Sequence, residues 1–170
     1  MNNLIQNIEK DISSNMKKEL YLFSIMWNLF EDKVYNNNFR YNREYTDQII
    51  QTLVNKSDNN IKVDDINSKL LKYNDKFQND PYCVYQAYSI RSNEISFKDF
   101  AKIYKSKDKN DKIKILILLV SRIRNNMFHG IKEISSLNNQ ENLFHLANEF
   151  LALILEENNV SIWRFKKRFY

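Results

Sequence analysis

The hydrophobic positions of this chain recur at intervals of three and four residues, which is the period of an amphipathic helix. The most regular pattern lies between residues 16 and 34 and joins Met16, Leu20, Phe23, Trp27, Phe30 and Val34. It stops at three consecutive asparagines, residues 36–38, a residue type that tolerates the left-handed backbone ending many helices. We therefore expect a long helix here that supplies a main part of the core.

Shorter patterns of the same kind predict further helices. Apolar spacing predicts a short helix near residues 4–12 and a longer one over 43–54, which the polar run 55–60 should end. Asp64 and Asp65 are expected to cap a helix that carries Ile66, Leu70, Tyr73 and Phe77. Because the chain has only one glycine and one proline, polar loops rather than β-turns should connect these helices.

Capping residues mark two later helix starts. Asp80 and Pro81 fit the N-cap and first position of a short helix, and Ser96 opens a near capping box with Asp99. The mixed-charge run 105–112 reads as a linker, and 135–140 as another loop. The last helix, near 141–157, should bury Leu143, Leu146, Ala147, Phe150, Leu153 and Ile154.

The most apolar segment, residues 112–120, leads into a polar stretch that contains one of the two histidines. Apolar residues at helical spacing continue through it, at Leu116, Val120, Ile123 and Met127. The only glycine, Gly130, follows His129 directly, and a helix can end through a glycine at little steric cost. A buried helix is therefore expected to end by presenting arginine, asparagine and histidine side chains.

Helical spacing decides which of these side chains can act together. Asn125 and His129 should lie about 40° apart around the helix axis, whereas Arg124 and His129 should lie about 140° apart. Arg124 and His129 can meet around one ligand only if the last turn unwinds, or if a second copy of the chain contributes its own pair. Gly130 permits the first arrangement, and two-fold symmetry would supply the second.

The sequence Arg124-Asn125-Asn126-Met127-Phe128-His129 resembles the R-x4-6-H signature of HEPN domains, in which a polar residue commonly follows the arginine. These domains are small all-helical modules of prokaryotic toxin and defence systems. The stretch 123–130, including the glycine after the histidine, is similar to ribonuclease-type members. The likeness covers about ten residues, and the rest of the chain agrees with it in fold class and length.

This resemblance implies one all-α, HEPN-like helical bundle over residues 1–170, with about four main helices and several short ones. It also implies a metal-independent endoribonuclease that acts as a toxin or an antiphage effector. The expected partners are RNA, a second copy of the chain in a homodimer, and a cognate antitoxin such as a nucleotidyltransferase. A non-catalytic HEPN-like module that binds nucleotide, RNA or a partner is the main alternative, and a helical interaction protein with a chance motif is another.

The chemistry of RNA cleavage explains why these residue types would be needed. Attack by the substrate's own 2′-hydroxyl requires a proton acceptor, a proton for the leaving 5′-oxygen, and cations that stabilise the phosphorane. A histidine can transfer either proton at neutral pH, and a guanidinium can hold two phosphate oxygens. We therefore assign catalysis to Arg124 and His129, with Asn125 assisting, and expect no cofactor. The competing interpretation is a capping histidine favoured by the helix dipole, beside a surface arginine.

Several other residues are expected to contact RNA. The net charge of +5, from 26 basic and 21 acidic residues, permits nucleic-acid binding without requiring it. The segment 161–170 mixes four cations with four aromatic residues, so it could bind phosphates and stack bases, dock on a partner or on anionic lipid, or pack its rings on the core. The expected contacts are Arg122, Asn126, Lys132, Arg164, Lys166, Lys167 and Arg168.

Other candidate chemistry is weaker. His145 has Glu141 and Glu149 four residues away on either side, but a metal site would need ligands from further helices, so an exposed polar face is the preferred interpretation. Cys83 is the only cysteine and is expected in the core, which excludes an internal disulfide and favours a reducing compartment. No apolar run approaches the roughly 20 residues that span a bilayer, and no signal peptide is visible. We expect a soluble, cytoplasmic protein without a membrane partner.

Overall fold

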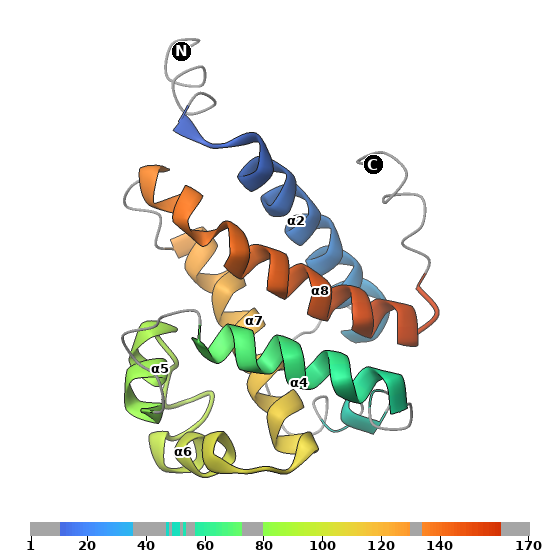
Figure 1. Cartoon of the computed structure of the whole chain (residues 1–170), viewed down its shortest axis with the longest axis vertical. Helices are drawn as coiled ribbons and strands as arrows, with labels where there is room; N and C mark the ends of the chain where they lie inside the picture. Colours follow the sequence, from blue (N-terminus) through green and yellow to red (C-terminus); the bar gives the residue numbers. More distant parts are fainter. Residues whose placement is uncertain are drawn as a thin grey trace.

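The computed structural model describes residues 11–35, 47, 49–51, 53, 57–72, 80–129 and 134–160, and every structural statement below refers to these residues. Helices are the only regular elements in this part of the chain, which confirms the all-α class. They are α2 (Ser14–Tyr35), α4 (Ser57–Lys72), α5 (Pro81–Ala87), α6 (Phe97–Lys105), α7 (Lys109–His129), the 3-10 helix η2 (Ile134–Gln140) and α8 (Glu141–Glu157) (Figure 1).

Helices α2 and α8 lie side by side and run in the same direction (Figure 1). At their starts, the backbone N–H of Ser13 donates to Oδ1 of Asn138 at 2.8 Å, and these two residues come shortly before α2 and α8 respectively. Further along, Asn148 of α8 donates to the backbone oxygen of Glu19 of α2 at 3.0 Å. Because parallel neighbours cannot be joined by a short turn, the chain between them is long enough to hold α4, α5, α6 and α7.

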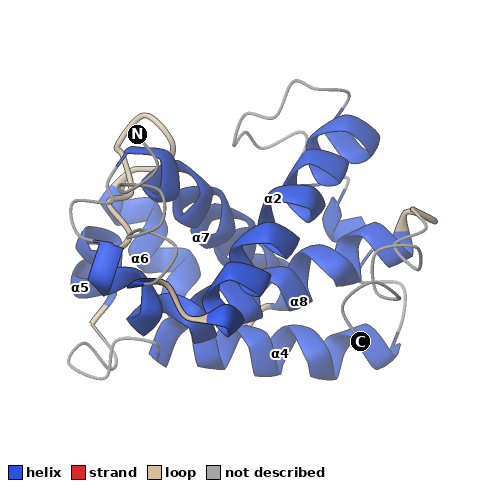
Figure 2. Cartoon of the chain, turned by 90° about the horizontal axis from the view of Figure 1, so that it is seen from above, coloured by secondary structure: helices blue, strands red, loops and turns tan. Residues whose placement is uncertain are grey.

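Helix α8 lies between α2 and α4, and at one end of the molecule α5 packs on α6, which in turn packs on α7 (Figures 1 and 2). Residues 115–123 of α7 are all buried, so this helix is enclosed on every side along its middle. The largest fully buried side chains are phenylalanines, and the rings of Phe23 and Phe144 meet edge to face at 5.2 Å between centroids. The core therefore fixes α7 rigidly at the point where its polar end begins.

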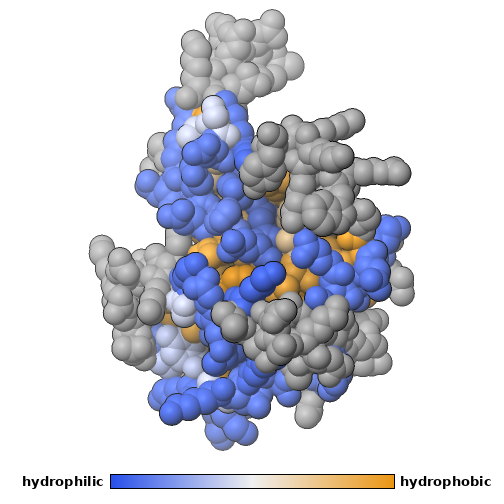
Figure 3. Space-filling view, turned by 45° about the vertical axis from the view of Figure 1, so that its right-hand side comes forward, coloured by the Kyte–Doolittle hydropathy of each residue, from blue (hydrophilic) through white to orange (hydrophobic). Residues whose placement is uncertain are grey.

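Apolar side chains also reach one face of the molecule. Figure 3 shows hydrophobic residues across the middle of that face, bordered by hydrophilic ones. None of the described helices combines the length and the apolar character that a membrane crossing requires.

Most of the expected helices are confirmed. The helix expected over residues 16–34 is α2, and the one expected over 141–157 is α8, whose predicted apolar positions are all buried. Asp80 caps α5 by accepting the Tyr82 N–H at 2.9 Å, and Ser96 caps α6 by accepting the Asp99 N–H at 3.1 Å.

Several expectations about connections, caps and burial are wrong. Helix α4 begins at Ser57, so residues 57–60 of the polar run 55–60, which was expected to end a helix, lie inside one, and Asp64 and Asp65 lie in its middle. They do not cap it: Asp65 pairs with Lys69 at 2.6 Å and Asp64 pairs with Lys112 of α7 at 2.9 Å. Residues 135–140 belong to η2 rather than to a loop. Cys83 was expected in the core, but its side chain is partly exposed and its thiol donates to Asp80 at 3.2 Å. Polar residues are compatible with an exposed helix face, and composition alone does not reveal which face that is.

Some predictions fall outside the described residues. These are most of the opening helix 4–12, the positions Tyr73 and Phe77, and the segment 161–170 with its four basic residues. Of the helix expected over 43–54, the described residues 47, 49–51 and 53 are helical, and Ile49, Ile50 and Leu53 are buried.

Candidate active site at the end of helix α7

The polar residues of the HEPN-like motif occupy the last two turns of α7. The backbone is helical through His129, so Arg122, Arg124, Asn125 and Asn126 all belong to one continuous helix with it. Side chains are described as far as Met127. The side chains of Phe128 and His129, and residues 130–133, which include Gly130 and Lys132, lie outside the described part of the structure.

Arg122 is a buried structural residue. Only 3% of its side chain is exposed, and its guanidinium donates from Nε to the Tyr88 backbone oxygen at 3.2 Å. Its Nη1 pairs with Oε1 of Glu94 at 3.2 Å, and its Nη2 donates to Oδ1 of Asn126 at 3.3 Å. These contacts leave no accessible side of the guanidinium for a phosphate. The burial of Arg122 is therefore at odds with the expectation that it contacts RNA.

Asn126 belongs to the same arrangement. Its Nδ2 donates to the Tyr88 oxygen at 3.2 Å while its Oδ1 accepts from Arg122, so both ends of the amide are occupied. We name Arg122, Asn126, Tyr88 and Glu94 the Arg122 network. It joins the end of α7 to the end of α5 and to the turn before α6, and we therefore give Asn126 a positioning role in place of the expected RNA contact.

Arg124 and Asn125 are placed differently. The Arg124 side chain is partly exposed, its Nη1 donates to Oδ1 of Asn125 at 3.1 Å, and its guanidinium carbon lies 5.9 Å from the ring centroid of Trp27 on α2. A cation at that distance from an indole is attracted by the ring, by roughly 0.5–1 kcal/mol at exposed sites and more where water is excluded. The contacts with Trp27 and Asn125 thus help to hold the Arg124 side chain in one orientation.

Helical geometry explains why Arg122 and Arg124 have different surroundings. Residues two apart lie about 160° from each other around an α-helix, so Arg122 and Arg124 face opposite sides of α7. Both stand at an R-x4-6-H distance from His129, with six and four intervening residues. Arg122 is buried at 3% exposure, whereas the Arg124 side chain is partly exposed.

The other histidine joins two helices. His145 is exposed on α8, with Nδ1 3.2 Å from Oε1 of Glu19 on α2 and Nε2 3.7 Å from Oε1 of Glu149. The expected i,i+4 carboxylate contact is confirmed, and Glu141 is turned away toward the Ser13 hydroxyl at 3.4 Å. Across the described ranges, no group of three or more histidine, cysteine, aspartate or glutamate residues could hold a metal ion.

Sequence reasoning missed three residues that shape this site. Glu94 and Tyr88 lie 28 and 34 positions from Arg122, and no spacing rule connects them to it. Trp27 was expected only as a core residue, and its burial at 4% exposure agrees with that, but it also supports Arg124. No family model, no curated protein and no solved structure matches this chain.

Proposed function

We propose that this chain is a HEPN-like, metal-independent endoribonuclease that acts as a toxin or antiphage effector on cytoplasmic RNA. The observation that carries the proposal is the different treatment of the two arginines before His129. Arg122 is buried in an ion pair, whereas Arg124 is partly exposed and oriented by Trp27 and Asn125. This difference supports a role for Arg124 in binding a phosphate, a role that the buried Arg122 cannot take.

Each residue has a definite role in the proposed reaction. His129 transfers the proton of the 2′-hydroxyl or of the leaving 5′-oxygen, and the Arg124 guanidinium stabilises the negative charge of the phosphorane. Asn125 orients Arg124 through the contact at 3.1 Å and lies one turn before His129. Lys132 and the basic residues of 161–170 remain proposed RNA contacts.

The proposed active unit is a two-fold homodimer. Because α7 is helical through His129, the last turn does not unwind before the histidine, and Arg124 and His129 stay about 140° apart on it. A second copy can then supply the missing partner, so that Arg124 of one chain works with the histidine of the other. A cognate antitoxin, such as a nucleotidyltransferase, would act by covering this unit.

Cleavage by purified variants tests the chemistry. His129→Ala and Arg124→Ala should each lower RNA cleavage by about 100-fold or more, and Arg124→Lys should also be impaired because lysine lacks the planar fork. Lys62→Ala, which removes an exposed cation from α4, is the control and should cleave normally. EDTA should have no effect, products should carry 2′,3′-cyclic phosphate ends, and a 2′-deoxy substitution at the cleaved position should block the reaction.

Mixing inactive variants tests the dimer. If each site uses an arginine and a histidine from different chains, an equimolar mixture of Arg124→Ala and His129→Ala should recover about a quarter of the wild-type rate, since half the dimers are mixed and each holds one intact site. A mixture as inactive as its components would contradict shared sites. Full activity in either single variant would overturn the catalytic assignment, and no cleavage of any RNA by the wild type would favour the non-catalytic binding module.

A further inference from the structure

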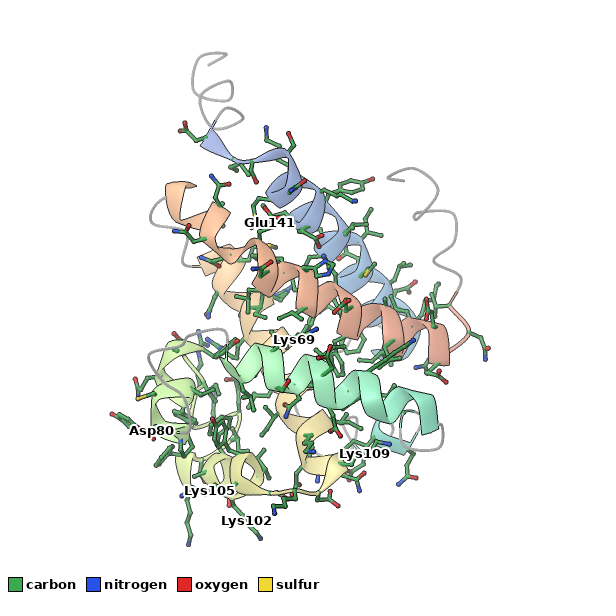
Figure 4. All side chains as sticks on the ribbon, in the orientation of Figure 1. Lys69, Asp80, Lys102, Lys105, Lys109 and Glu141 are labelled. Atoms are coloured by element: carbon green, nitrogen blue, oxygen red, sulfur yellow. The ribbon has the colours of Figure 1, made fainter. Side chains whose placement is uncertain are left out.

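A row of exposed lysines follows helix α6. Lys98, Lys102 and Lys105 are spaced four and three residues apart, so they lie within a sector of about 60° and span about 10 Å along the axis. All three are exposed, and Figure 4 shows Lys102 and Lys105 projecting away from the ribbon on the same side. No ion pair to another described residue holds these three side chains.

The acidic residue on α6 does not neutralise this row. Asp99 lies about 100° around the helix from Lys98 and about 60° from Lys102, but its Oδ2 accepts a hydrogen bond from the Ser96 hydroxyl at 2.6 Å. That contact closes the cap of α6, so its carboxylate is directed to the start of the helix. The lysine row therefore presents a concentrated positive charge.

Two exposed aromatic rings lie at the start of α5 and α6, where Phe97 directly precedes Lys98 in the sequence and lies about 100° from it around the helix. Tyr82 at the start of α5 is 54% exposed, Phe97 at the start of α6 is 40% exposed, and their centroids lie 5.5 Å apart, edge to face. Phe97 also rests against the ring of Tyr85, which is 8% exposed, at 5.5 Å. Among the described residues the only other exposed large hydrophobic side chain is Tyr21 on α2. Tyr85 therefore supports the pair on its buried side, and the other side of the pair is open to solvent.

We propose that this surface, formed by Tyr82, Phe97, Lys98, Lys102 and Lys105 and here called the α6 face, binds a single-stranded nucleic acid. Lysine ammonium groups along the helix contact phosphates, and the two rings offer π-faces and edges to an unpaired base. A duplex is a poorer occupant because its base faces are stacked inside. The identification of the natural strand as RNA rests on the proposed function. The binding of a single strand to the α6 face does not depend on it.

The α6 face belongs to the same rigid unit as the candidate site. The Arg122 network ties Tyr88, at the end of α5, and Glu94, just before α6, to the last turns of α7. A strand held on the α6 face is therefore fixed relative to the helix that carries Arg124. The α6 face would then select single-stranded substrate, while the end of α7 cuts it.

Binding of a fluorescent oligo-dT 12-mer, which carries no 2′-hydroxyl and cannot be cut by the proposed reaction, tests the inference by anisotropy over a salt series. The variant Lys98→Ala/Lys102→Ala/Lys105→Ala should reduce the log–log salt slope by about 2, since each phosphate contact on a single strand contributes roughly 0.7. The matched control is Lys33→Ala/Lys62→Ala/Lys69→Ala, which removes the same charge from exposed positions on α2 and α4. The control should keep the wild-type slope.

The aromatic contribution has its own pair of variants. Tyr82→Ala should weaken binding about fivefold or more, because stacking on an aromatic side chain contributes measurably to each bound base. Tyr21→Ala removes a similarly exposed ring, 47% exposed, from α2 and should bind like the wild type. Circular dichroism and melting temperature of all four variants should match the wild type, since each altered side chain is exposed.

Equal slopes for the two triple variants, or equal affinities for Tyr82→Ala and Tyr21→Ala, would overturn the inference. Binding of a 12-base-pair duplex as tight as the single strand would overturn it too, as would binding to phosphatidylserine vesicles with no binding to the oligonucleotide. A wild type that cuts no RNA yet shows the predicted slopes would refute the proposed nuclease and leave the α6 face standing. A wild type that cuts RNA, with equal salt slopes for the two triple variants, would refute the α6 face and leave the proposed nuclease standing.

Discussion

Removing Glu94 should destabilise the protein more than removing Arg122, although the two side chains form the same ion pair. Glu94→Ala leaves the Arg122 guanidinium, 3% exposed, without its only described carboxylate partner, and the Tyr88 and Asn126 oxygens remain as neutral acceptors. Stranding a buried charge in this way costs about 3–5 kcal/mol. We expect about 3 kcal/mol here because two acceptors remain, which lowers the melting temperature by about 6–12 °C in a chain of this size.

Arg122→Met reverses the situation. It removes the buried charge and fills much of the same volume, and the Glu94 side chain that it leaves is 18% exposed and can reach water. The Tyr88 oxygen keeps its bond from Asn126 at 3.2 Å, so we expect a cost of about 1–2 kcal/mol.

Urea unfolding of the two single variants and the double variant at neutral pH measures these costs. The double variant should be more stable than Glu94→Ala alone, because no unpaired cation remains inside. A Glu94→Ala protein that unfolds within 1 kcal/mol of the wild type, or that is clearly more stable than Arg122→Met, would refute this reasoning.

Other predictions follow from single contacts. Asp80→Ala should cost about 1 kcal/mol through loss of the α5 cap, measured by urea unfolding. The same change should shift the pH profile of iodoacetamide alkylation at Cys83 to lower pH, because the hydrogen bond to Asp80 holds the pKa of that thiol above its usual value. Phe144→Ala should cost about 3–5 kcal/mol, since it empties a fully buried position against Phe23. Trp27→Phe should retain more cleavage than Trp27→Leu at temperatures where both are folded, because only the first keeps a ring for Arg124. Sedimentation equilibrium at micromolar concentration should give a dimer, and a strict monomer would contradict the shared site.

Local signals predicted the parts of the fold that local interactions decide. The start of α5 was predictable because Asp80 and Pro81 each act within two residues of the helix start, and α8 because its apolar positions follow one helical face. The start of α4 was not, because residues 57–60 are serine, aspartate and two asparagines, which more often cap or end a helix than continue one. The pairing of Asp64 with Lys112 of α7, 48 residues away, is a tertiary contact that the local sequence does not encode.

The candidate site likewise combines features that the local sequence decides with features that tertiary contacts decide. Position on α7 and distance from His129 are properties of the local sequence, and both arginines satisfy them. Burial of Arg122 depends on Glu94 and Tyr88, and support of Arg124 depends on Trp27, which lies 97 positions earlier in the chain.

The pattern R-x-R-x4-H therefore contains two different uses of one side-chain type. Arg122 donates hydrogen bonds to Tyr88 and pairs with Glu94, and these contacts link α7 to α5 and α6, which carry the α6 face. This link gives the second arginine a fixed helix end from which to act, and it keeps the α6 face in a constant relation to that end. Exchanging the two roles would require Glu94 and Trp27 to exchange sides of α7, since the arginines lie about 160° apart. The tertiary partners, and not the spacing, therefore decide which arginine is buried and which is partly exposed.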